Sequence, residues 1–262
     1  MSQSHATTLL AAGVLCLMTG CATTKTTTAT GTPDPWEGWN RGVQSFNDEV
    51  DHHLMKPIAK GYRWITPAFI DTGITNFFNN IGDIRVTMND ALQGKLAQSG
   101  RDGARFIVNT TAGVGGFLDV ASRIDLPRHD EDFDQTLAVW GIPSGPYVVL
   151  PFLGPSSSRG IFGLVGDAAM NPLSYTGAYF ASGAVSTAVS GGLGAVNVTD
   201  LRADNLATEK IASEAALDRY EFFRDSYLSQ RNYLIKDGNV PEEDVLKFQE
   251  TEDKGLAPIN PY

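Results

Sequence analysis

Two long segments of this chain carry no charged side chain, yet proline and glycine interrupt both of them. Segment 135–158 contains four prolines within fifteen residues, so a regular membrane-spanning helix is excluded there. Two interpretations remain open for both segments: buried core or close-packed loop, or apolar surface that faces lipid or lines a lipid passage. The second segment, 168–199, is long enough to cross a bilayer, but it is interrupted by Pro172, Gly183, Gly191, Gly192 and Gly194.

The N-terminus is typical of a bacterial lipoprotein precursor. Residues 9–18 are apolar over a length that suits a signal peptide, and small residues lead into Cys21. Cleavage before Cys21 and attachment of lipid to it make 1–20 a signal peptide and 21–33 a lipidated, threonine-rich tether. Ala22 stands where an aspartate is the usual inner-membrane retention signal, so we expect delivery to the outer membrane. The leader carries no Lys or Arg, and a buried apolar helix with an incidental cysteine is the alternative.

Charge and cysteine content exclude several classes of protein. The chain has two cysteines, and Cys16 leaves with the leader, so the mature protein has no disulfide and no thiolate metal site. The net charge of −10 disfavours nucleic acid as a partner and provides no polybasic attraction to anionic lipids. Stability is therefore expected from a packed core within residues 34–236, a length that allows one large domain or two small ones, and membrane contact is expected from acyl chains and apolar faces.

The folded part is expected to be all-α. Asp34 can cap a first helix, in which Glu37 completes a capping box and an apolar stripe continues to a stop before Pro57. Period-two alternation does not extend over several segments, so a large sheet is not expected. Further helices are expected from Lys56–Pro57, from Thr66–Pro67 to Ile81, over 83–92, over 102–111 (with a strand as the alternative for residues 105–111) and over 205–236, and residues 237–262 are expected to form an acidic, proline-containing flexible tail.

Patterns that carry catalysis or bind metal are scarce. His52 and His53 are adjacent, so they point in different directions on a helix and are expected to be a surface pair. His129 lies in a run of charged residues that is expected to be a solvated loop. The chain contains neither a Gly-x-Ser-x-Gly elbow nor a His-Glu-x-x-His motif. We therefore expect no enzymatic activity, no cofactor and no metal.

The glycine-rich run at residues 113–116 superficially suggests phosphate binding. It lacks the third glycine of a dinucleotide fingerprint and the Lys-Ser/Thr pair of a P-loop. A tight turn or a helix break is therefore expected, and the alternative is a nest of backbone amides that touches a phospholipid headgroup.

Five motifs follow one another between residues 34 and 235. They are Asp34-Pro-Trp-Glu-Gly-Trp-Asn-Arg41 with Phe46-Asn47, Phe106-Ile-Val-Asn-Thr-Thr-Ala-Gly-Val-Gly-Gly-Phe-Leu-Asp-Val-Ala121, Asp132-Phe-Asp-Gln-Thr-Leu-Ala-Val-Trp-Gly141, Gly145-Pro-Tyr-Val-Val-Leu-Pro-Phe-Leu-Gly-Pro-Ser156 and Tyr220-Glu-Phe-Phe-Arg-Asp-Ser-Tyr227. Each motif alone is weakly specific. Their ordered set behind a lipoprotein signal resembles the MlaA (VacJ) family of outer-membrane lipoproteins.

The resemblance implies a ring-like single domain of short broken helices that lies in the periplasmic leaflet of the outer membrane around a central amphipathic channel. It implies removal of mislocalised phospholipid from the outer leaflet, transfer to a periplasmic carrier of the MlaC type, and association with a porin trimer. Phospholipids, that carrier and the porin are thus the expected partners. The alternative is a structural outer-membrane lipoprotein scaffold that binds porins without moving lipid.

The resemblance also places a channel-controlling region near Phe46 and Asn47, and we hypothesise that Asn47 helps to set a closed state. The two uncharged segments could supply the apolar wall of the passage. Candidate channel-lining or lipid-facing residues are Gly113, Gly115, Gly116, Tyr147, Leu150, Phe152 and Leu153.

Overall fold

The computed structural model describes residues 34–175, 183–206 and 218–239. These ranges are mostly helical, so the all-α prediction is confirmed. The predicted signal peptide, Cys21 and the tether lie outside the described residues, as does the tail from residue 240 onward. In chain order the elements are α2 (Glu37–Val50), the π-helical turn η1 (Asp51–Met55), α3 (Lys56–Ile65), α4 (Ala68–Leu92), α5 (Leu96–Thr111), the 3-10 turn η2 (Ala121–Ile124), α6 (Phe133–Val139), β1 (Tyr147–Leu150), β2 (Gly154–Ser157), α7 (Ser158–Met170), the 3-10 turn η3 (Pro172–Tyr175), α9 (Gly183–Asp204) and α11 (Arg219–Ile235).

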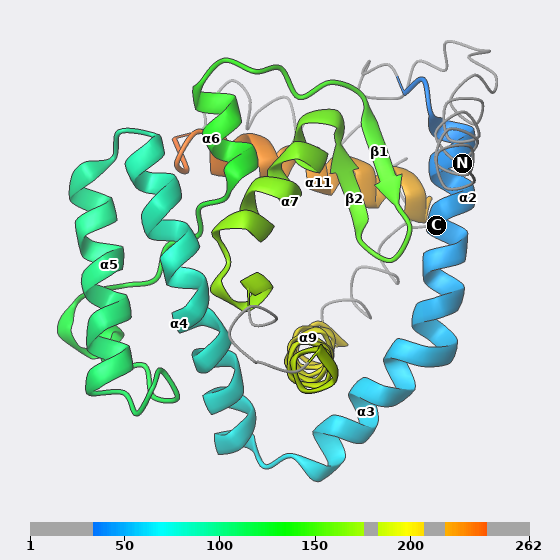
Figure 1. Cartoon of the computed structure of the whole chain (residues 1–262). Coiled ribbons are helices and arrows are strands. Elements are labelled where there is room, and N and C mark those ends of the chain that lie inside the picture. Colours follow the sequence, from blue (N-terminus) through cyan, green and yellow to red (C-terminus); the bar gives the residue numbers. More distant parts are fainter. Residues whose placement is uncertain (1–33, 176–182, 207–217, 240–262) are drawn as a thin grey trace, which may run out of the picture.

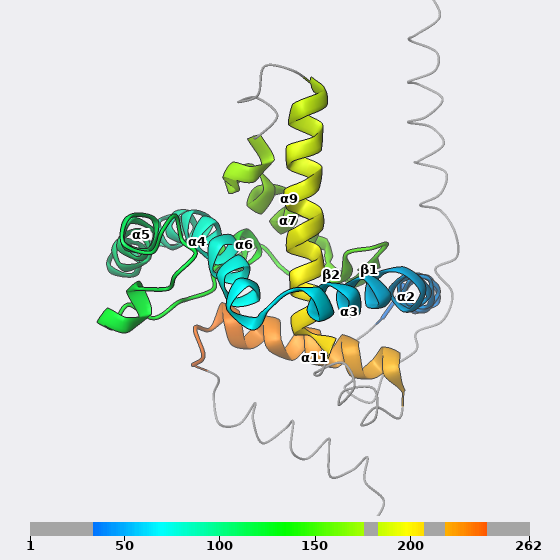
Figure 2. The same cartoon turned by 90° about the horizontal axis from the view of Figure 1, so that it is seen from below.

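The other elements surround α9, which Figure 1 shows end-on. α2, η1 and α3 run along one side, α4 and α5 lie opposite them, and α6, α7 and the hairpin of β1 and β2 occupy the side between (Figure 1). In the view from below, α9 stands across the layer that contains α2, α3, α4 and α5, and α11 runs along one face of that layer (Figure 2). α9 packs against α3 and α4, and α11 packs against α6 and β2.

The first helix begins later than expected, because Asp34 has a tertiary role. Helix α2 starts at Glu37 and has no side-chain cap. Asp34 is 4% exposed, and its carboxylate accepts hydrogen bonds from the Trp36 amide, from Asn40 and from the hydroxyl of Tyr220. Asp34 thus accepts from one amide at the helix start and also joins this end of the chain to α11, but the predicted capping box is wrong because Glu37 pairs with Arg41.

Proline does not end this helix either. The π-helical turn η1 follows α2 directly and continues into α3, so the expected stop before Pro57 is wrong. Pro57 occupies the first turn of α3, just after η1. A π-helical turn is wider than an α-helical one, so it can accommodate the pyrrolidine ring and the missing N–H donor without a break.

Several other predicted boundaries also differ from the structure. The two helices expected on either side of Gly82 form the single 25-residue helix α4, which packs along α5. Glycine costs a helix about 1 kcal/mol but does not end it, so Gly191, Gly192 and Gly194 also remain within α9. The strand alternative within 102–111 is wrong, since α5 covers this segment.

The predicted helix over 205–236 is not continuous, because the backbone at Asp218 is extended and a new helix follows it. Asn205 follows the end of α9, and residues 207–217 lie outside the described residues. Helix α11 begins at Arg219, and the Asp218 carboxylate caps it by accepting hydrogen bonds from the amides of Tyr220 and Glu221.

The distribution of polarity is the reverse of that in most water-soluble domains. Arg224 and Gln135 are among the largest fully buried side chains, whereas Trp64 is 87% exposed. Charged side chains are almost never fully buried unless they are paired. Across the described parts of the chain, no helix combines enough length with enough hydrophobicity to cross a bilayer. The most exposed apolar side chains, which we call the apolar surface, are Trp64, Ile65, Phe69, Leu96, Ile107, Val114, Phe152, Leu153, Phe162 and Val165.

Ion pairs satisfy much of the polar interior. Arg105, which is 3% exposed, contacts the carboxylates of Asp83 and Asp119 at 3.2 and 2.8 Å and donates to the Leu126 carbonyl. Burial opposes ionisation of Asp119, but hydrogen bonds from Arg105 and Ser122 outweigh it and lower the pKa of Asp119 to about 2. This cluster ties α4 and α5 to the loop that precedes α6.

Asp90 on α4 is a buried acid whose pKa is shifted in the opposite direction to that of Asp119. It is fully buried, and burial together with the neighbouring Asp102 raises the pKa of Asp90 above its ordinary value. The folded protein therefore binds this proton more tightly than the unfolded chain. The resulting contribution to stability is complete below the unfolded pKa and is lost as the pH rises through the folded pKa.

We expect Asp90→Asn to flatten the pH dependence of stability, because an uncharged amide replaces the protonated acid. Between about pH 5 and about pH 9, the free energy of unfolding of the wild-type protein in detergent should fall more steeply than that of the variant, by about 1.4 kcal/mol for each unit of pKa elevation. Circular dichroism measures both curves. Asp130→Asn is the matched control, since the Asp130 side chain is 61% exposed. Parallel curves for Asp90→Asn and wild type would contradict the assignment.

Candidate functional site

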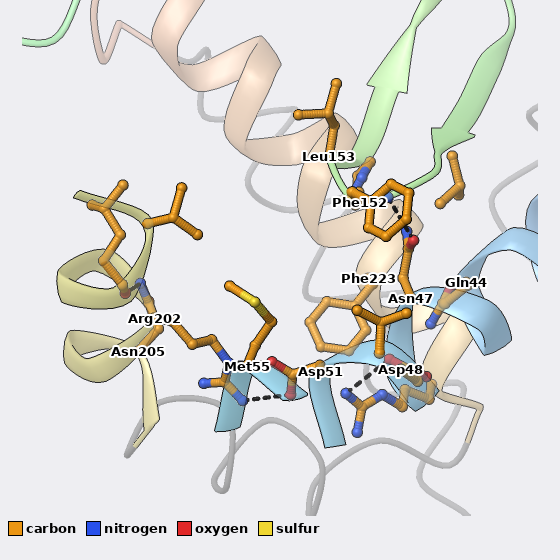
Figure 3. A pocket seen from close by; sticks show the side chains of 17 residues that line it. Gln44, Asn47, Asp48, Asp51, Met55, Phe152, Leu153, Arg202, Asn205 and Phe223 are labelled. Atoms are coloured by element: carbon orange, nitrogen blue, oxygen red, sulfur yellow. Dashed lines mark hydrogen bonds and ion pairs between the residues drawn. The ribbon is translucent and has the colours of Figure 1, made fainter. Parts of the chain in front are cut away.

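A groove of about 720 Å³ lies where four elements meet. It is bordered by α2 with η1, by the hairpin, by the C-terminal end of α9 and by the start of α11 (Figure 3). The lining residues are Gln44, Asn47, Asp48, Val50, Asp51, Met55, Val149, Phe152, Leu153, Gly154, Pro155, Val198, Leu201, Arg202, Asn205, Arg219 and Phe223.

The groove is amphipathic, and its two characters are separated in space. Phe152 and Leu153 project from the hairpin tip on one side, and the charged side chains of Asp48, Asp51 and Arg202 lie on the opposite side (Figure 3). Such a surface offers ion pairing at one end and an apolar wall at the other. It has the chemistry to hold an amphiphile, and it does not present a catalytic arrangement of side chains.

Two asparagines of α2 hold the hairpin in place. The Asn40 amide accepts a hydrogen bond from the Val149 N–H at 2.8 Å and donates to the Tyr147 carbonyl at 3.2 Å. Two helical turns later, the Asn47 amide accepts a hydrogen bond from the Phe152 N–H at 2.8 Å and donates one to the Leu150 carbonyl at 3.0 Å. In a larger sheet, a neighbouring strand would hydrogen-bond to the backbone at the outer edge of β1. Here the side chains of Asn40 and Asn47 make these hydrogen bonds.

The hairpin tip is also held by an aromatic contact. The rings of Phe46 and Phe152 lie edge to face with centroids 5.2 Å apart. Phe152 has a φ of 64°, a left-handed conformation that costs a bulky residue free energy. Contacts from Phe46 and Asn47 therefore stabilise a turn that the local sequence disfavours, and they couple α2 to the groove wall.

Two ion pairs form the charged end of the groove. Asp51 in η1 pairs with Arg202 in the last turn of α9 through two hydrogen bonds. Arg202 donates from Nε to one carboxylate oxygen and from Nη2 to the other, the latter at 2.6 Å. Asp48 pairs with Arg219 at the start of α11 at 3.3 Å. Asp48 and Asp51 share one face of the first helix because they are three residues apart. The π-helical turn begins at Asp51, so it sets the direction of this side chain.

Only some of the predicted site residues lie at the groove. Phe46 and Asn47 lie against the hairpin tip, which carries Phe152 and Leu153. Asn47, Phe152 and Leu153 line the groove. Tyr147 is buried in a core cluster with Tyr220, so the structure places it away from the groove and from lipid. Burial raises the pKa of the Tyr147 hydroxyl. Leu150, which is half-buried at the end of β1, does not line the groove.

The predicted glycines form a turn, and none of them lines the groove. A side chain on Gly113 would come within 2.2 Å of the Leu118 carbonyl, and one on Gly116 within 2.6 Å of Asn80. Gly115 has a φ of 69°, which favours glycine. The run therefore serves close packing after α5, and the predicted tight turn is confirmed.

Within the described part of the chain, the histidines are not part of any group of three or more potential metal ligands. His53 is exposed beside Glu49, as expected for a surface pair. The charged loop at His129 is less solvated than expected, because Glu131 is buried and pairs with Lys95 at 2.9 Å.

Sequence reasoning did not identify Asn40, Asp48, Asp51, Arg202 or Arg219 as site residues. Their partners lie more than 100 residues away along the chain. The only local signal was the spacing of Asn40 and Asn47, which places both amides on one face of the helix.

Comparison with known proteins identifies the family. A sequence model described as MlaA lipoprotein matches residues 32–234. This chain belongs to the MlaA lipoprotein family. It is 32% identical over 242 residues to the intermembrane phospholipid transport system lipoprotein MlaA of Haemophilus influenzae, which covers 88% of this chain and 93% of that protein.

Two further relatives extend the comparison. An uncharacterised protein of Rickettsia felis is 36% identical over 143 residues, so this chain aligns with just over half (57%) of its length. A chain solved in work on the structural basis for maintenance of bacterial outer membrane lipid asymmetry superposes with a TM-score of 0.66 at 29% identity, covering 78% of this chain and all of that one. This chain therefore shares the fold of that solved chain.

We expect Asn47→Ala to loosen the hairpin tip, since it removes both hydrogen bonds between α2 and residues 150–152. Losing this donor and acceptor should cost about 1–3 kcal/mol, so amide exchange at Phe152 should accelerate by a factor of about 5 to about 150. Hydrogen exchange with mass spectrometry of the hairpin measures this. Gln44→Ala, one turn earlier on the same groove wall, is the control and should leave the exchange rate unchanged. Equal exchange in Asn47→Ala and wild type would show that the amide does not hold the tip.

Proposed function

We propose that this protein is an outer-membrane lipoprotein that removes mislocalised phospholipids from the outer leaflet and passes them on for return to the inner membrane. The observation that carries the proposal is the amphipathic groove, with ion pairs at one end and an apolar wall at the other. A phospholipid has the same two parts, a charged headgroup and apolar chains. Transport of this kind requires binding surfaces and no covalent chemistry.

The membrane location is supported by the apolar surface defined above. Side chains such as Trp64 and Phe69 would each expose a large apolar area to water, whereas in a lipid leaflet the same area is stabilising. The polar interior is compatible with this environment because its charges are paired with one another. In our proposal the protein lies in the periplasmic leaflet through its own apolar surface, and lipid on Cys21 assists delivery.

The wider pathway rests on the family rather than on the groove. The name of the Haemophilus influenzae relative assigns it to an intermembrane phospholipid transport system. By analogy, we propose that the groove is part of a channel through the protein, that a periplasmic carrier of the MlaC type receives the lipid, and that a porin trimer is a partner in the membrane.

We further propose that Phe46 and Asn47 control access to the channel. Both hold the hairpin tip, and the tip forms one wall of the groove. Release of the tip would widen the groove without unfolding α2. Control of the opening would then depend on a small number of side-chain contacts.

Transport can be tested by deleting the gene and measuring outer-leaflet phospholipid with a membrane-impermeant amine reagent. We expect the deletion to raise surface phosphatidylethanolamine and the wild-type gene to restore it. Leu201→Glu places a carboxylate in the apolar wall and should fail to restore it, because burying a charge next to acyl chains is costly. Leu201→Met keeps the wall apolar and serves as the matched control.

The alternative function makes the opposite prediction. A scaffold that binds a porin without moving lipid would leave lipid asymmetry normal in the deletion strain. Normal asymmetry together with recovery of a porin in pull-downs would therefore replace the transport proposal with the scaffold. Immunoblots must show equal amounts of each variant, so that loss of function is not loss of protein.

Deletion of Asn47 tests the control region. Removing one residue rotates the following helix by about 100°, so Asp48 and Asp51 would leave the groove face and the hairpin tip would lose its hydrogen bonds. We expect outer-leaflet phospholipid to change relative to wild type in the same amine-labelling assay. An unchanged level, with the protein present at normal abundance, would contradict a role in channel control.

A further inference from the structure

We propose that the acyl chains of a bound phospholipid run along one face of α9, from Leu201 towards Gly191, and that the headgroup lies at the other end of this face, near Asn205. The bound lipid then has a single orientation, with its headgroup on the side of α11 and its chains on the opposite side. This inference deepens the proposed function and depends on it, because it assigns the direction of the lipid in the same groove.

The face of α9 that borders the groove changes from polar to apolar along the helix. Asn205 and Arg202 line the groove near the C-terminal end of α9, and Leu201 and Val198 line it further towards the N-terminus. Residues that are three, four and seven positions apart share one face of a helix, so these four side chains form a single line. A phospholipid has the same order of parts, a polar head followed by apolar chains.

The same face continues beyond the groove as an open surface. Ala195 and Gly191 precede Val198 by three and seven residues, so they lie on its face, and both are exposed. A side-chain carbon added at Gly191 would have no neighbouring side chain within 4 Å. Small residues by themselves bind nothing. Here they extend the apolar end of a cavity, so an acyl chain that leaves the groove meets no described side chain at Gly191.

The opposite side of α9 is unsuitable for an acyl chain. Asp200 is 1% exposed, and its carboxylate accepts hydrogen bonds from Tyr62 of α3 at 2.9 Å and from Thr75 of α4 at 3.0 Å. A step of two residues turns a helix by about 200°, so Asp200 and Val198 point to opposite sides of α9. Helices α3 and α4 pack on the side of Asp200. The groove side is therefore the one along which a chain avoids the polar interior.

The length of the apolar part of this face suits the chains of one leaflet. Leu201 and Gly191 are ten residues apart on α9. An α-helix rises about 1.5 Å per residue, so this part of the face spans about 15 Å. The hydrocarbon core of a bilayer is about 30 Å thick, and one leaflet supplies about half of it. The acyl chains of one lipid can therefore lie beside this part of α9.

The direction of α9 in the fold gives the lipid its direction. α9 stands across the layer that contains α2, α3, α4 and α5, and its N-terminal half lies on the side of this layer away from α11 (Figure 2). Arg219 at the start of α11 belongs to the charged end of the groove. A headgroup at this end therefore points towards α11, and chains that follow α9 point away from it.

The test places a fluorescent bimane label at one of two neighbouring glycines of the processed full-length lipoprotein in detergent. Gly191→Cys puts the label on the proposed chain face. Gly192→Cys is the matched control, because it is turned by about 100° from Gly191 and is also exposed without a side chain within 4 Å. Each variant replaces a helical glycine, so neither should destabilise α9. Cys16 leaves with the leader and lipid occupies Cys21 in our proposal, so wild type treated with the same label measures the background.

The delipidated protein then receives one equivalent of phosphatidylethanolamine that carries a nitroxide quencher on one acyl chain. With the nitroxide at the chain end, quenching in Gly191→Cys should exceed quenching in Gly192→Cys by about twofold, because the two positions lie on different sides of a helix about 10 Å across. A nitroxide near the glycerol should quench the Gly191→Cys label less than one at the chain end, and the reverse order would overturn the orientation. Addition of Leu201→Glu should abolish the difference between the two positions, whereas Leu201→Met should preserve it.

The outcomes separate this inference from the proposed function. Native mass spectrometry counts the lipid bound to each protein, and circular dichroism establishes that each variant is folded. Bound lipid with equal quenching at both positions would overturn the path along α9 and leave the lipid groove intact. Binding of no phospholipid by folded wild type would overturn both. A difference that persists with Leu201→Glu would show that chains reach Gly191 from the surrounding micelle and not through the groove, and it would also overturn the inference.

Discussion

Asp134 holds three helices together, and its interactions show how this fold is stabilised. Its carboxylate accepts a hydrogen bond from Arg159 of α7 at 2.7 Å and another from Arg231 of α11 at 3.0 Å, while Arg231 also binds Asp132 at the start of α6. Burial opposes ionisation of Asp132, but Arg231 lowers its pKa below the ordinary value. A charged side chain is costly to bury unless it meets a partner of opposite charge, so each buried pair specifies which helices come together. Paired charges in the interior therefore decide how the helices meet.

The same constraint produces the groove. Its walls come from elements that polar side chains connect: Asn40 and Asn47 hold the hairpin to α2, and ion pairs join η1 to α9 and α2 to α11. A region assembled in this way contains charges that are already paired with each other. The contacts that hold these elements together therefore also determine the charged end of the groove.

Local pattern predicted the helical content well and the helix boundaries poorly. The expectation of no large sheet is consistent with the described residues, where β1 and β2 form the one sheet that the structure contains. Boundaries drawn at Pro57 and at Gly82 were wrong, because a π-helical turn accommodates the proline and packing against α5 carries α4 through the glycine. Asp34 looked like a helix cap, but a buried aspartate can bind distant donors, and Tyr220 is 186 residues away. Of the predicted site residues, Asn47, Phe152 and Leu153 line the groove, whereas Tyr147 belongs to the core.

The sequence by itself determined that this chain is helical and that its long uncharged segments are interrupted by proline and glycine. It also determined the family, through five motifs in a characteristic order. The tertiary structure alone decided which charges meet. Asp48 pairs with Arg219 and Asp51 pairs with Arg202, and in each pair the partners are more than 150 residues apart in the sequence. The hairpin and Asn47, which hydrogen-bond to each other, are more than 100 residues apart. Periodicity reports only on neighbours within a few turns. A pairing between distant helices depends on how they pack, so the groove and its charged end became visible only in three dimensions.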